Sequence, residues 1–94
     1  MQIIGSDGQV ELLDNRIVVT RKGFFAMLVH KFAGPVDIPI KGIGRIEMKE
    51  AGILSGGSFK IVFNGSEFSE IKFQKKSNEA FKKLKEQIFA KIQH

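Results

Sequence analysis

Residues 77–93 read SNEAFKKLKEQIFAKIQ, and this stretch decides the fold. It contains no glycine and no proline, and its apolar residues recur every three or four positions, which is the spacing of one face of an α-helix. Ser77 or Asn78 offers a side-chain oxygen to the first amides of such a helix. We therefore predict an amphipathic helix over residues 77–93 with an apolar face made of Phe81, Leu84, Ile88, Phe89 and Ile92.

A helix with one apolar face needs a surface to cover, and the preceding residues supply short alternating strands. Pro39 confines its strand to an edge or an end of a sheet, and the out-of-phase Phe68 predicts a bulge or a loosened start near residues 67–69. Asp14-Asn15 and Asn64-Gly65 are predicted hairpin turns, and glycines mark a loop around Ile53-Leu54. The predicted strands lie near residues 3–4, 9–13, 16–21, 36–40, 43–49, 58–63 and 70–73.

The segment FFAMLVHKFA, residues 24–33, has two interpretations. One set of apolar residues follows helical spacing, and Gly34 is well suited to end a helix, so we predict a short helix here. A strand is the alternative, because the run is only about ten residues long. In the helical interpretation the face that anchors the segment consists of Phe25, Leu28, Val29 and Phe32.

Composition predicts one small soluble domain over residues 1–94, with a weakly structured start at residues 1–8. The chain has no cysteine and no tryptophan, so disulfides and thiol chemistry are excluded. No apolar run approaches the length of a membrane span, and the first residues are too short for a signal peptide. We expect a cytoplasmic protein.

The residues for catalysis are largely missing. His30 and His94 are the two histidines, and the acidic residues are scattered singly over outward positions and turns. No glycine-rich loop with a following lysine suggests a phosphate site. We therefore predict a protein that is not an enzyme, with no catalytic residues, no metal site, no cofactor and no small-molecule substrate.

Positive charge is concentrated near the start of the predicted helix. Residues 72–85 contain six lysines against the single acidic residue Glu79, and this excess accounts for the whole net charge of +5. Such a corner attracts an acidic protein, an anionic lipid or a nucleic acid. The alternative interpretation is a solvated corner that lysine keeps soluble. The candidate basic patch consists of Lys72, Lys75, Lys76, Lys82 and Lys83.

A second candidate surface lies in the segment 24–33. Its helical interpretation leaves large apolar side chains outside the anchoring face, and exposed apolar groups of this kind mark interfaces. The alternative is that they pad one open end of a barrel. Nucleic-acid binding is disfavoured, because most phenylalanines fall on core faces and not on basic strand faces. The candidate interface consists of Phe24, Phe25, Met27, His30 and Lys31.

Residues 34–52, GPVDIPIKGIGRIEMKEAG, resemble the central motif of bacterial pleckstrin-homology-like (PH-like) domains. A strand ending in Ile-Pro leads through a short turn into a strand that starts with Ile and closes with Lys-x-x-Gly. Residues 16–23, 57–59, 71–73 and 78–81 are similar to the same pattern. The resemblance implies a mostly β fold: a bent antiparallel sheet or barrel of six to seven strands, or two near-orthogonal sheets, capped by one C-terminal helix.

The same resemblance implies a binding scaffold, with self-association in some relatives. Two departures limit what the resemblance implies. The Asp14-Asn15 turn is short and acidic, whereas lipid-binding PH domains carry a basic loop there for inositol phosphates. The chain also stops at His94, where relatives often continue into a helical domain, so we expect a lone domain or a fragment. We expect a module for protein contact or self-association. Peripheral binding to an anionic membrane or a polyanion through the basic corner is the alternative.

Overall fold

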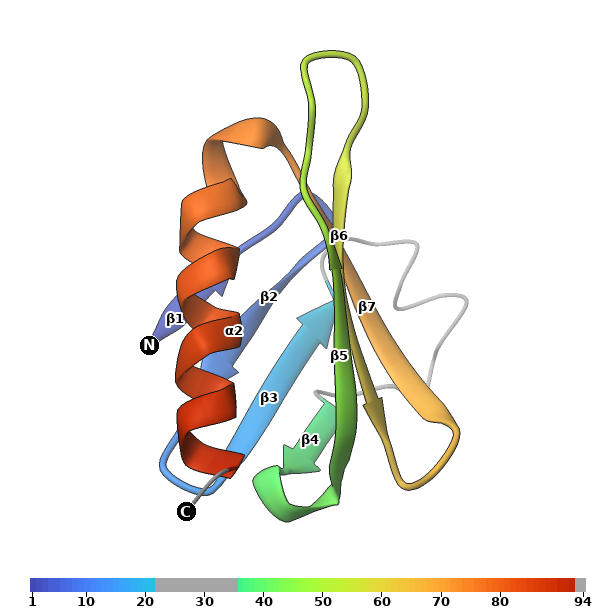
Figure 1. The fold of residues 1–94 in the computed structure, drawn as a ribbon, viewed down its shortest axis with the longest axis vertical. Coiled ribbons are helices and arrows are strands. Elements are labelled where there is room, and N and C mark those ends of the chain that lie inside the picture. The colour runs from blue at the N-terminus through green and yellow to red at the C-terminus, as the bar shows by residue number, and fades with distance from the viewer. Residues whose placement is uncertain (22–35, 93–94) are drawn as a thin grey trace.

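The computed structural model describes residues 1–21 and 36–92, with Arg21 described by its backbone alone. This part of the chain forms seven strands, two short 3-10 turns and one long helix, whose arrangement is drawn in Figure 1. The predicted short helix at residues 24–33 lies outside the described residues. The elements are β1 (Gln2–Ile4), β2 (Gly8–Leu12), β3 (Arg16–Arg21), β4 (Val36–Pro39), η1 (Ile40–Gly42), β5 (Ile43–Lys49), β6 (Gly57–Phe63), β7 (Glu67–Phe73), η2 (Lys75–Ser77) and α2 (Asn78–Ile92).

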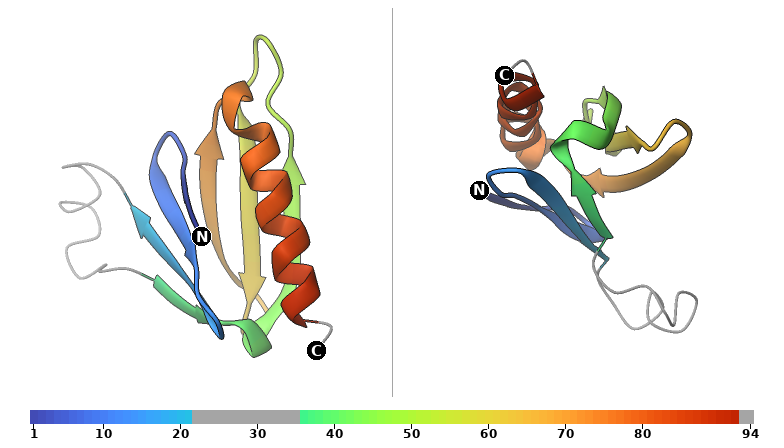
Figure 2. Two further views of the ribbon diagram at one scale, coloured as in Figure 1. Left: turned by 90° about the vertical axis from the view of Figure 1, so that its left-hand side faces the viewer. Right: turned by 90° about the horizontal axis from the view of Figure 1, so that it is seen from below.

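The strands form two antiparallel sheets, one of four strands in the order β1-β2-β3-β4 and one of three in the order β5-β6-β7. Seven strands and a C-terminal helix confirm the expected mostly β class. The sequence did not decide between a barrel and an open arrangement of sheets. The described strands do not close into a barrel, because no ladder joins the two sheets. Instead, α2 occupies the open side between them, beside the β1–β2 edge and in front of β5 (Figure 2).

The two sheets touch at one end without pairing as strands. The amide of Ser6, in the turn between β1 and β2, donates to the carbonyl of Lys72 in β7 at 2.7 Å. The Lys72 amide donates in return to Oδ1 of Asp7 at 2.9 Å. At the other end the chain itself passes from β4 through η1 into β5. These connections hold the two sheets together at their ends, and α2 covers the side between the sheets (Figure 2).

The core is built where both sheets meet α2. Phe81, Leu84 and Ile88 are fully buried, as predicted, and the Phe81 ring stacks on Phe73 with centroids 4.3 Å apart. Burying three such side chains contributes roughly 1.5–3 kcal/mol each. The predicted apolar face was too wide, since Phe89 and Ile92 are 38% and 39% exposed at its margin.

The three-stranded sheet corrects one further prediction. β7 pairs with β6 residue for residue, so the bulge expected near Phe68 is absent there. Phe68 points outward and is 56% exposed, with Lys60 Nζ 4.2 Å from its ring centroid, while the small Ser69 takes the inward position. The irregularity of register lies in β5 instead, between Ile43 and Arg45.

The turns follow their sequence signals. Asn64 and Gly65 adopt positive φ angles of 49° and 87°, as a tight hairpin between β6 and β7 requires. At the Asp14-Asn15 turn the amide of Leu13 donates to the carbonyl of Arg16 at 2.9 Å. β4 is an edge strand that ends at Pro39, as the missing amide of proline predicts. No helix in the described ranges is long and apolar enough to cross a bilayer.

Candidate binding surface

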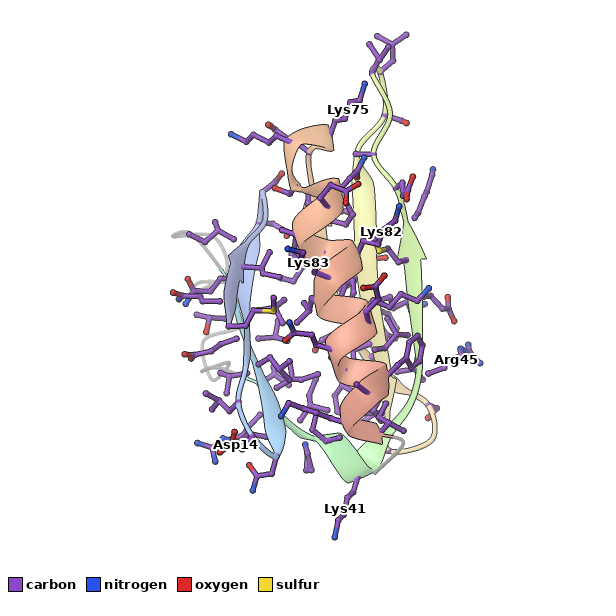
Figure 3. All side chains as sticks on the ribbon, turned by 60° about the vertical axis from the view of Figure 1, so that its left-hand side comes forward. Asp14, Lys41, Arg45, Lys75, Lys82 and Lys83 are labelled. Atoms are coloured by element: carbon purple, nitrogen blue, oxygen red, sulfur yellow. The ribbon has the colours of Figure 1, made fainter. Side chains whose placement is uncertain are left out.

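The five lysines of the candidate basic patch do not form one continuous surface. Figure 3 shows Lys75 at the end of the molecule where the β5–β6 loop projects, and Lys82 and Lys83 on different sides of α2. This divergence follows from the helix, because consecutive residues point about 100° apart. Lys72 lies on β7, where its Nζ is 3.4 Å from a carboxylate oxygen of Glu70. The structure thus brings Lys75 and Lys76 together on η2 and separates the others from them.

Lys82 is engaged by an acidic neighbour. Its Nζ lies 3.1 Å from Oε1 of Glu50, at the end of β5. The hydrogen bond to Glu50, the charge of that carboxylate and the charge of Glu79 raise the pKa of Lys82. Lys82 therefore stays protonated at neutral pH, but part of its charge is already compensated. The ion pair of Lys82 with Glu50 joins α2 to the β5–β6 loop and leaves less of the lysine charge for a partner.

Lys75 and Lys76 lie beside the β5–β6 loop, and Lys76 also borders a hollow beside the β1–β2 turn. Together with Gln74 they line an open hollow of about 540 Å³, whose other wall is made by residues 52–56. Within residues 1–21 and 36–92, neither lysine has an acidic partner within ion-pair distance. We name this end of the molecule the basic tip, comprising Lys49, Lys75, Lys76 and the loop residues 50–56.

The loop of the basic tip ends in two exposed aliphatic residues. Gly52 and Ser55 close a tight turn, with the Gly52 amide donating to the Ser55 carbonyl at 2.9 Å. Ile53 and Leu54 occupy the two central positions and are 87% and 99% exposed. The loop projects beyond both sheets and the start of α2 (Figure 1). The sequence located this loop, but it gave no reason to expect a functional role for its two aliphatic residues.

The base of this loop is fixed to the helix. Asn78, the first residue of α2, accepts a hydrogen bond from the Ala51 amide at 2.8 Å. Its side-chain Nδ2 donates to the Ala51 carbonyl at 2.9 Å, so one amide side chain satisfies both backbone groups of one residue. Ala51 is itself buried. Asn78, one of the two residues expected to cap α2, therefore ties the loop to the helix.

A second hollow lies at the opposite end of the molecule. It measures about 850 Å³, with an apolar floor that includes Ile40 and Ile43 and a rim that includes Lys41 and Lys91. Lys91 Nζ donates to the carbonyl of Asp14 at 3.4 Å across this rim. Figure 3 shows Asp14 and Lys41 at this end, away from Lys75. No buried side-chain nitrogen or oxygen of the described residues lacks a partner to direct a ligand there.

In the described ranges, no three His, Cys, Asp or Glu side chains gather closely enough to hold a metal ion. Ser69 is the buried polar residue of the described core. The candidate interface of Phe24, Phe25, Met27, His30 and Lys31 lies outside the described residues.

Comparison with known proteins gives no family. No protein-family model, curated protein or solved structure matches the chain.

Proposed function

We propose that this chain is a non-catalytic binding module of PH-like architecture. What supports the architecture is the resemblance of residues 34–52 together with two antiparallel sheets whose open side is covered by a C-terminal helix. Loops and edges carried on such a framework are the usual places for binding, because the framework holds them in position.

The proposed partner is an anionic surface, either a membrane or another polyanion, that contacts the basic tip. The observation that carries this proposal is the pair Lys75 and Lys76, which lie side by side without acidic partners among the described residues. Uncompensated lysines attract anionic groups and bind them with a strong dependence on salt. Lys49 at the end of β5 adds a third positive charge to the same end.

Two double variants with the same change in net charge test this proposal. Lys75→Gln with Lys76→Gln removes both cations of the basic tip, and Lys41→Gln with Lys91→Gln removes two cations from the opposite end. Binding to anionic vesicles, heparin and a single-stranded oligonucleotide is measured at low and high salt. We expect the first variant to lose about 25-fold in affinity at low salt, which is about fivefold per lysine, and the second to lose far less.

Equal losses in both variants would show that net charge acts without a defined site, which contradicts the proposal. A wild-type protein that binds none of the three polyanions at low salt would contradict it directly.

Protein contact or self-association is the second proposed function. β4 and β5 are each paired on one side only within the described residues, so their free edges offer backbone groups to an extended peptide or a second copy. Light scattering over a range of protein concentrations tests self-association. We expect the mean mass to rise with protein concentration. A Phe24→Asp, Met27→Asp double variant changes two residues of the candidate interface, and we expect it to abolish this rise. A constant monomer mass would contradict this function.

A further inference from the structure

The β5–β6 loop carries a feature that the stability of the fold does not explain. Ile53 and Leu54 are the most exposed large apolar side chains of the described residues, and they are adjacent at the centre of one tight turn. Such positions are usually filled by Gly, Asn, Asp, Ser or Pro, which favour turn geometry and interact with water. Neither side chain belongs to the buried core. Two aliphatic residues here expose apolar surface without a folding benefit, which is typical of a contact surface.

The two side chains are presented by a loop whose base is fixed. Asn78 binds both backbone groups of Ala51, and Lys82 contacts Glu50 from the same helix. On the other side of the loop, Gly57 packs so closely on the Phe73 ring that a Cβ atom would come within 2.5 Å of it. Because these contacts fix both ends of the loop, less conformational freedom is lost when the tip binds than in a loop without them.

Positive charge lies on the η2 side of this apolar tip. Residues 49–56 and 74–82 carry four lysines against two glutamates, and one of these, Glu50, is already engaged by Lys82. Lys75 and Lys76 share a hollow with Ile53 and Leu54. Figure 3 shows Lys75 directed toward the end of the molecule where the loop projects. An apolar tip that projects beyond a neighbouring pair of cations is complementary to a layer of anionic groups with an apolar layer behind it.

We propose that Ile53 and Leu54 insert into the boundary between headgroups and acyl chains of an anionic bilayer, while Lys75 and Lys76 contact the headgroups. This inference rests on the proposed function and narrows its partner from polyanions in general to a lipid bilayer. Lipid chains adapt to a protruding tip, whereas a protein partner must supply a matching cavity and a nucleic acid offers no apolar layer. The contact lies at the opposite end from the Asp14-Asn15 turn.

The lack of tryptophan in the chain permits a direct test of insertion. A Leu54→Trp variant places a single tryptophan at the tip, and a Phe68→Trp variant places one on an exposed site near the β6–β7 turn, at the other end of the sheet. Vesicles of phosphatidylcholine with about one-third phosphatidylserine are added to each. We expect the emission of Trp at position 54 to shift to shorter wavelength and to be quenched by lipids brominated in the upper acyl chain. Vesicle binding without such a shift would overturn the inference.

The energetic role of the tip is tested by an Ile53→Ser, Leu54→Ser double variant in vesicle sedimentation. We expect its partition coefficient to fall on the order of 100-fold, about tenfold for each aliphatic side chain, with the salt dependence retained. Phe68→Ser is the matched control, since it removes an exposed apolar side chain far from the tip, and we expect less than about a twofold change. Far-UV circular dichroism verifies that each variant is folded.

The possible failures of the two proposals are distinguishable. If the wild type binds anionic vesicles and the tip variant binds equally well, insertion is overturned while the proposed function stands. If the wild type binds the oligonucleotide or heparin but no vesicle, the lipid partner is overturned and polyanion binding stands. If nothing anionic binds, both fall. A tip variant that dissociates an oligomer, in the absence of vesicle binding, would assign the tip to a protein contact and overturn the inference.

Discussion

At the scale of single residues, small side chains decide how closely the parts approach. Gly57 begins β6 in full contact with the core, and a Cβ atom there would lie 2.5 Å from the Phe73 ring and 2.7 Å from the Lys49 carbonyl. Its neighbour Gly56 has more room, with the nearest atom 3.6 Å away. The sequence suggested that both glycines belong to a loop, whereas the second is a packing residue of the sheet.

Gly57→Ala is therefore predicted to destabilise the protein, and Gly56→Ala serves as its control. The added methyl group of the first variant forces the Phe73 ring or the β5 backbone to move, which costs about 1–3 kcal/mol of the free energy of unfolding. Urea denaturation followed by circular dichroism measures the change. Equal effects of the two substitutions would contradict the close approach of Gly57 to Phe73.

A second residue-scale prediction concerns Asn78. Asn78→Ala leaves the amide and the carbonyl of Ala51 without their partner, and we expect a loss of about 1–3 kcal/mol together with faster hydrogen exchange of the Ala51 amide. Gln87→Ala removes an exposed amide side chain from the same helix and is expected to change neither quantity appreciably. Unaltered exchange at Ala51 in the Asn78 variant would show that the loop is held by other contacts.

At the scale of elements, α2 covers the side of the core that the two sheets leave open (Figure 2). Leu84 is fully buried on its inner face, and Leu84→Ala is predicted to cost about 2–5 kcal/mol through lost apolar contact and the remaining cavity. Phe89→Ala removes a larger side chain from the exposed margin of the same helix and is expected to cost less than about 1 kcal/mol. Thermal unfolding compares the two. A similar loss for both would mean that the inner face of α2 is not essential to the core.

Most elements could be predicted from the sequence because their signals are local. The apolar residues of α2 follow a 3.6-residue period, and Asn64-Gly65 adopts the positive φ angles that these residue types favour. The direction of Phe68 and the separation of the sheets could not be predicted, because they depend on contacts across strands, such as Lys60 with the Phe68 ring. The helical periodicity also overestimated the buried face at Phe89, since the area of sheet available to α2 is limited.

The candidate site was predictable in part. Lys75 and Lys76 were recognisable from the charge excess of residues 72–85, but the divergence of Lys72, Lys82 and Lys83 appears only once helix and strand are placed. Ile53 and Leu54 carried one signal that sequence reading could have used: two large aliphatic residues between glycines, where a turn normally has polar residues.

At the scale of the whole molecule, both sheets and the helix share one core. Val10 of the four-stranded sheet, Ile61 of the three-stranded sheet and Leu84 of α2 belong to the same buried cluster. We therefore predict a single unfolding transition, since neither sheet nor the helix retains a separate core when one of the others unfolds. Because the chain has neither tyrosine nor tryptophan, circular dichroism and methyl NMR signals of Val10 and Ile61 are suitable probes. Loss of helical signal at a lower urea concentration than either methyl signal would contradict this prediction.

The position of the β5–β6 loop also makes the two ends of the molecule different. The loop lies at one end of the longest axis, and the last described turn of α2 lies at the other (Figure 1). A molecule anchored by Ile53 and Leu54 would hold the last described turn of α2 away from its support, at a height comparable to the 36 Å extent of the domain. The domain would then act as a spacer, and a fluorophore attached after Ile92 would report that height by energy transfer to the supporting layer.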